Sequence, residues 1–156
     1  MDLEMQNEIQ RYFNIPSRIF RLQNSIKEAR EDFYSRTFTS HSRFIDDEWT
    51  LVGYRVETQV LNLLSRIEGK ERHIEILHEK RRYFDQFLSS LPEGDQRQLH
   101  LKYRSEKQYQ IHRVEARAYE EIKEIEEAIC HKYGFPVEHE EVSERSVDDV
   151  AAILGV

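Results

Sequence analysis

A long apolar stripe with a strong turn signal in its middle constrains the fold of this chain more than any other feature. Its first half runs from Val56 to Leu91 at alternating three- and four-residue steps, which is the heptad spacing of a helix packed along one face. The turn signal Pro92-Glu93-Gly94-Asp95 follows, and a second stripe then runs from Ile111 to Tyr133,. Helices joined by a short turn pack antiparallel. The sequence therefore predicts an all-α fold, an elongated helical bundle built on a long antiparallel helical hairpin.

We expect one helix over Leu51 to Leu91 and a single return helix over Asp95 to Tyr133, because no helix breaker interrupts either stripe,. Gly134 is placed to end the return helix,. The heptad spacing also suits pairing between two chains, so we expect a homodimer. The residues assigned to the core or dimer seam are Val60, Leu63, Ile67, Ile74, Leu77, Phe84 and Leu88.

Shorter segments precede the hairpin. We expect a helix over Leu3 to Phe13 and a second helix capped by Ser17,. Residues 34–49 lose the helical period and concentrate aromatic side chains. They read as a loop held down by its aromatics or, alternatively, as a surface loop that exposes them to a partner. We expect a helical domain over 1–136, followed by an acidic linker and a short C-terminal helix over 137–156.

Composition narrows the function. The net charge is −7, and the chain has one cysteine and few glycines. A single thiol forms no intramolecular disulfide, and no apolar run approaches the ~18 residues of a membrane span. The sequence lacks glycine-rich phosphate-binding motifs, a nucleophile elbow and a repeated Glu-x-x-His pair,. We therefore expect a cytoplasmic, non-membrane protein that is not an enzyme and needs no cofactor or metal.

One segment of this acidic chain carries a local excess of positive charge. Between residues 102 and 117, five lysines and arginines face two glutamates. Clustered basic side chains on a helix are the electrostatic signature of phosphate binding. The residues predicted to bind DNA are Lys102, Arg104, Lys107, His112, Arg113 and Arg117.

The sequence around the turn resembles a known module. Phe84-x-x-x-Leu88-x-x-Leu91-Pro92-Glu93, followed by Gln98-Leu99-x-Leu101-Lys102-Tyr103, is similar to the start of sigma-factor region 4. With the long helix upstream, residues 51–133 resemble phage late-gene transcription regulators of the RinA/ArpU type. The resemblance implies a regulator that binds DNA or RNA polymerase.

The segment after Tyr103 departs from that family. It is short for the two helices of a helix-turn-helix, and no glycine marks a turn between them,. A second hypothesis therefore stays open: a helical interaction module, an inhibitor or adaptor without DNA reading. An acidic module of this kind suits a basic protein partner.

Overall fold

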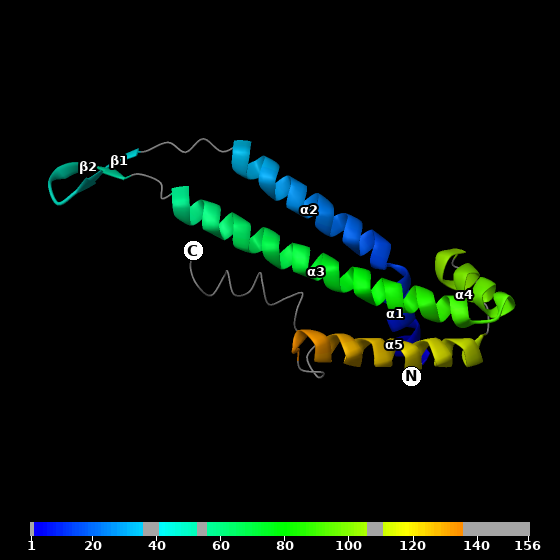
Figure 1. The fold of residues 1–156 in the computed structure, drawn as a ribbon. Helices are drawn as coiled ribbons and strands as arrows, with labels where there is room; N and C mark the ends of the chain where they lie inside the picture. Colours follow the sequence, from blue (N-terminus) through cyan, green and yellow to red (C-terminus); the bar gives the residue numbers. More distant parts are fainter. Residues whose placement is uncertain (1, 36–40, 53–55, 106–110, 136–156) are drawn as a thin grey trace. The chain divides into compact units, whose positions relative to one another are not determined.

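The described part of the chain is helical apart from one small hairpin. A computed structural model of the chain describes residues 2–35, 41–52, 56–105 and 111–135. The predicted all-α class is confirmed for these residues, with one two-stranded addition (Figure 1). None of the described helices is long and apolar enough to cross a bilayer. The elements are α1 (Asp2–Phe13), α2 (Ile15–Ser35), β1 (His41–Ile45), β2 (Glu48–Val52), α3 (Val56–Ser90), α4 (Glu93–Ser105) and α5 (His112–Tyr133).

The chain divides into two compact units that interleave in sequence. Unit 1 combines residues 1–13 with the chain from residue 80 onward, and unit 2 comprises residues 14–79. One division falls between α1 and α2, and the other falls inside α3. The linker and short helix expected over 137–156 lie outside the described residues.

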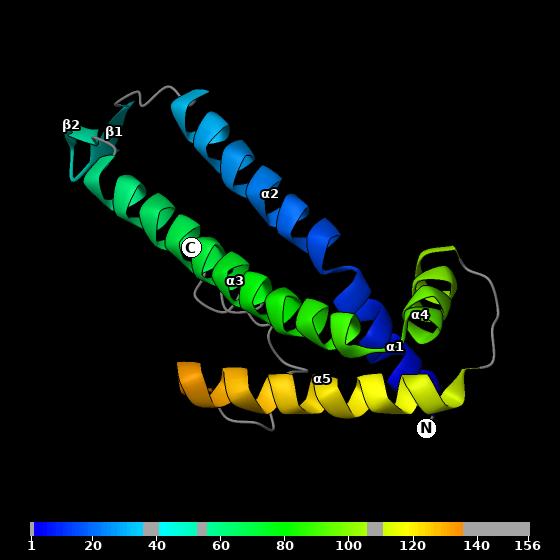
Figure 2. The ribbon, with the colours of Figure 1, turned by 45° about the vertical axis from the view of Figure 1, so that its right-hand side comes forward.

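Unit 2 is built on α2 and the larger part of α3. The two helices run side by side in both views (Figures 1 and 2). Ile19 and Ile26 of α2 are buried, as is Ile67 of α3. Lys70 Nζ donates a hydrogen bond to Ser25 Oγ across the pair. The apolar stripe of α3 is therefore buried here at Ile67, whereas Val60 and Leu63 are half-buried.

The segment expected to be a loop instead contains a β-hairpin. Strands β1 and β2 pair antiparallel, and Ile45 faces Glu48 across the turn. Asp46 and Asp47 occupy the turn with φ of 50° and 64°, which fits the type I′ turn that matches the twist of paired strands. The predicted loop is wrong for residues 41–49. The helix predicted from Leu51 is also wrong at its start, because β2 extends to Val52 and α3 begins at Val56.

Unit 1 packs α1 against both α4 and α5. Aromatic rings fill the space between them: Phe13 of α1 stacks on Tyr103 of α4 with centroids 5.3 Å apart, and it meets the edge of Phe84 of α3 at 5.5 Å. Buried side chains line the inner face of α5, among them Ala118, Ile122, Ile125 and Ile129. Gly134 ends α5 with φ of 72°, and the cap N–H bonds the carbonyl oxygen of Cys130,.

The single return helix is contradicted, because the return segment forms two helices. α4 ends at Ser105, Ile111 has non-helical φ and ψ of −129° and 42°, and α5 starts at His112. Tyr103 Oη donates to Glu115 Oε1 over 2.7 Å. In one continuous helix, twelve intervening steps would separate these residues by about 18 Å of rise. Both α4 and α5 pack against α1. These contacts favour two separate helices over one continuous helix.

Candidate nucleic-acid interface

A buried carboxylate holds α4 and α5 together. Glu115 is 0% exposed. Its Oε1 accepts hydrogen bonds from Lys102 Nζ and from Tyr103 Oη, both on α4. Its Oε2 has no hydrogen-bond partner in the described part of the chain and lies 3.9 Å from His112 Nδ1. Because a buried charge needs partners, this cluster holds the first turn of α5 against α4. The cluster of Lys102, Tyr103 and Glu115 is called the corner brace below.

The corner brace is continuous with the aromatic core. Burial, and next the hydrogen bond to Glu115, raise the pKa of the Tyr103 phenol. The hydroxyl therefore keeps its proton to a higher pH than an ordinary tyrosine does. Gln10 Nε2 of α1 donates to the Tyr103 carbonyl oxygen over 3.3 Å. The first helix of the chain thus supports α4, which in turn supports α5.

A second polar cluster fixes the other half of α5. Glu126 accepts a hydrogen bond from Tyr12 Oη of α1 and pairs with Lys80 Nζ of α3 at 2.6 Å. The Lys80 and Glu126 side chains are both largely buried. Glu115 and Glu126 lie eleven residues apart, about three helical turns. Anchoring at both points gives α5 one defined orientation within unit 1.

The predicted DNA-binding residues divide into three groups. Arg113 and Arg117 are exposed and lie one turn apart on α5,. Arg104, near the end of α4, and His112, the first residue of α5, are exposed as well. The Lys102 side chain is only 14% exposed because its ammonium group points to Glu115, so it serves the corner brace. Lys107 lies outside the described residues.

The start of α5 is electropositive for a second reason. Ile111 makes no side-chain capping bond, and its carbonyl oxygen accepts from the N–H groups of Val114 and Glu115. The first N–H groups of an α-helix have no acceptor within the helix and carry the positive end of its dipole. Arg113 lies in this first turn, and Arg117 lies one turn further along α5,. Near the brace, burial and next the charge of Arg104 lower the pKa of His100, which makes that imidazole neutral.

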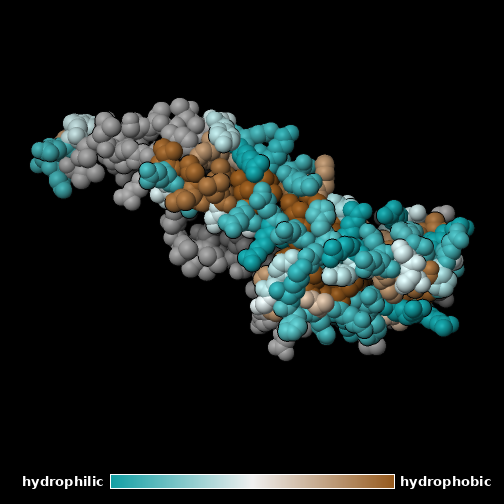
Figure 3. Space-filling view, in the orientation of Figure 1, coloured by the Kyte–Doolittle hydropathy of each residue, from teal (hydrophilic) through white to brown (hydrophobic). Residues whose placement is uncertain are grey.

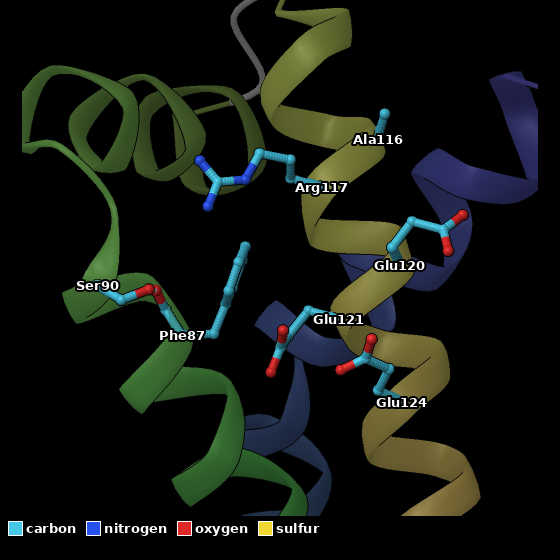
Figure 4. A pocket seen from close by; sticks show the side chains of 7 residues that line it. All are labelled: Phe87, Ser90, Ala116, Arg117, Glu120, Glu121 and Glu124. Atoms are coloured by element: carbon cyan, nitrogen blue, oxygen red, sulfur yellow. The ribbon is translucent and has the colours of Figure 1, made fainter.

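An open groove with mixed charge lies beside Arg117. It encloses about 410 Å³ between the end of α3 and the middle of α5. Figure 4 shows Arg117 of α5 and Phe87 of α3 pointing into the same space, with Glu121 and Glu124 further along α5. Phe87, Ser90, Ala116, Arg117, Glu120, Glu121 and Glu124 line the groove. The exposed face of α5 therefore changes from basic in its first two turns to acidic in the next two.

The predicted seam lies mostly inside the chain's own core. Its buried members are Ile67, Leu77, Phe84 and Leu88, and its half-buried members are Val60, Leu63 and Ile74. Other apolar side chains on the first turns of α3 face solvent, and Figure 3 shows them as a hydrophobic patch. Val56, Leu61 and Leu64 are the exposed members. A surface for a second chain would therefore lie beside the seam rather than on it.

Sequence reasoning missed the corner brace. Helical periodicity places Glu115 beside Ala118 and Ile122 on the inner face, and that position was the available signal for its burial.

The three comparisons made for this chain, with known protein families, with curated proteins and with solved structures, find no match.

Proposed function

We propose that this protein is a DNA-binding transcription regulator that lays the first two turns of α5 on a DNA duplex. The observation that carries the proposal is the corner brace. It joins α4 to the inner side of α5 through Glu115, while Arg113 and Arg117 stay exposed on α5. In a helix-turn-helix, one helix supports a second helix whose N-terminal residues contact the DNA. The α4–α5 pair has the parts that this arrangement needs.

Two further points support the proposal. The return segment forms two helices rather than one, which supplies the supporting helix that a continuous helix would lack. The Leu91-Pro92 turn and the Leu99-x-Leu101-x-Tyr103 pattern also resemble sigma-factor region 4. In this proposal the protein acts in the cytoplasm, at DNA and beside RNA polymerase.

We also propose that the regulator is a homodimer. Two exposed arginines on one helix offer few phosphate contacts, and each contact adds only a part of the binding. Regulators of this kind gain affinity by placing two copies on neighbouring half-sites. The exposed apolar residues Val56, Leu61 and Leu64 of α3 are the surface proposed to join the copies.

A salt titration with labelled duplex DNA tests the DNA-binding proposal. Fluorescence anisotropy should detect wild-type binding at about 50 mM salt and a steep loss by about 200 mM. The variant R113A/R117A should bind more weakly to every sequence, and its slope of log K against log salt should be shallower by roughly two. Both arginines are exposed, so the fold should not change.

A matched variant controls for net charge. R21A/K27A removes two exposed positive charges from α2, in unit 2. It should leave the salt slope unchanged. An equal loss in both variants would mean that the DNA senses only total charge, and the assignment to α5 would then be rejected.

One observation favours the alternative, an interaction module for a basic protein partner. The net charge is −7, and three glutamates line the groove beside Phe87. If micromolar wild-type protein retains no DNA at low salt, the regulator proposal is rejected and the interaction module is kept. In that case, R113A/R117A would disturb at most a protein complex.

A further inference from the structure

The tip of the β-hairpin presents two aromatic rings to solvent. Phe44 and Trp49 face each other across the strands, with ring centroids 5.3 Å apart and planes at 66°. The Phe44 residue is 57% exposed and Trp49 is 71% exposed. Facing residues in an antiparallel pair point to the same side of the ribbon. The rings therefore form one edge-to-face platform on one face of the hairpin.

Two carboxylates stand next to this platform. Asp46 and Asp47 form the turn, are exposed, and lie two residues from Phe44 and Trp49 respectively. Both take the left-handed backbone conformation. Asn-Gly and Asp-Gly are the favoured pairs in such a turn, so an Asp-Asp pair is a costlier choice that places two negative charges at the tip.

Aromatic faces together with carboxylates recognise a cation. The face of an aromatic ring carries negative potential and attracts a guanidinium or ammonium group placed over it. Arginine also stacks flat on rings and bonds carboxylates with its fork of N–H donors. Phosphate would be repelled by Asp46 and Asp47, so these charges disfavour nucleic acid here.

We propose that the Phe44–Trp49 platform, with Asp46 and Asp47, binds an arginine-bearing segment of a protein partner. The surface lies in unit 2 and shares no residue with the α4–α5 interface. It therefore adds a second contact to the proposed regulator and stands independently of DNA binding. In this acidic chain, the two exposed rings and the two exposed carboxylates belong to one six-residue stretch, Phe44 to Trp49.

Trp49 is the chain's only tryptophan, so its emission reports directly on this surface. The probe is an octapeptide of alternating glycine and arginine, titrated into the full-length protein at low salt. The matched peptide replaces arginine with citrulline, which keeps the shape and removes the charge. The arginine peptide should change the Trp49 emission saturably, and the citrulline peptide should not.

Two protein variants separate this site from general charge attraction. D46N/D47N removes both tip charges, and asparagine also tolerates the left-handed conformation. It should weaken peptide binding at least about fivefold. E4Q/E28Q removes two exposed carboxylates elsewhere and should leave binding unchanged. Cross-strand contacts between the two rings in NMR spectra check that the hairpin persists in each variant.

Four results would overturn the proposal. An equal response to the citrulline peptide would make the platform a plain apolar contact. Unchanged binding by D46N/D47N would remove the carboxylates from the site. A response to a single-stranded oligonucleotide but not to the peptide would assign the rings to nucleic acid. Loss of the peptide response at protein concentrations where the chain dimerises would show that a second copy covers the rings.

Discussion

Removing Lys102 tests whether the corner brace holds unit 1 together. Lys102→Met keeps the aliphatic stem and deletes the ammonium group that pairs with Glu115. Glu115 is fully buried and the Lys102 side chain is 14% exposed, so solvent cannot replace the lost partner. Leaving a buried charge uncompensated costs about 3–5 kcal/mol. We expect Lys102→Met to lower the free energy of unfolding of unit 1 by that amount.

Glu115→Gln should cost less than Lys102→Met. The amide oxygen can still accept the hydrogen bond from Tyr103, and Lys102 can extend toward water,. The expected cost is about 1–3 kcal/mol. Combining the two changes removes the unpaired charge, so the double variant should be more stable than the sum predicts, with a coupling above about 1 kcal/mol.

Urea unfolding followed by far-UV circular dichroism measures these differences. The control is Arg97→Met on the same helix, which breaks an ion pair that is exposed on both sides and should cost less than about 1 kcal/mol. If Lys102→Met is no more destabilising than Arg97→Met, the corner brace does not hold α4 to α5.

Two more predictions follow from burial and exposure. The pKa of Tyr103 is raised above its ordinary value of 10.0. The stability that depends on its protonated hydroxyl is therefore fully present below about pH 10 and is lost as the pH rises further. Alkaline unfolding should thus be shallower for Tyr103→Phe than for wild type. L61E/L64E changes two exposed side chains, so it should keep the helix content and convert a dimer to a monomer. If the wild type sediments as a monomer at concentrations on the order of tens of micromolar, the dimer is rejected.

The sequence predicted the helices in which the spacing of apolar residues coincides with the face that is buried. The seam residues Ile67, Leu77 and Phe84 are buried as expected, and α5 ends at Gly134. These features follow from local chemistry, since helix period and left-handed glycine depend on few neighbours. The turn at Pro92 separates α3 from α4 for the same reason.

The break between α4 and α5 was not readable from the sequence. Leu99, Tyr103 and Ile111 keep the helical period across it, and neither glycine nor proline marks it. The break is stabilised by tertiary contacts of Glu115 and of α1. Such contacts leave no signal in the sequence near residue 105. The hairpin was missed because Asp-Asp is an unusual pair for a type I′ turn.

The candidate site was chosen from the sequence by charge clustering. The clustering selected Arg113 and Arg117, which the structure shows to be exposed. It also selected Lys102, because sequence alone does not show which cation a buried carboxylate takes. Lys102 and Glu115 are thirteen positions apart. In one continuous helix they would lie on different faces, so they meet only because α4 and α5 are separate helices.

The dependence of unit 1 on α1 has a consequence for synthesis. Tyr12 bonds Glu126 across 114 positions, and Gln10 bonds Tyr103 across 93. On a ribosome that adds about 5–20 residues per second, α1 therefore waits roughly 6–23 s for its last partner. Residues 14–79, in contrast, form a contiguous unit whose contacts close over shorter loops,. Ile9 and Tyr12, both buried in the finished protein, thus stay unburied longest while the chain is made, and α1 is where we expect a chaperone to bind the nascent chain.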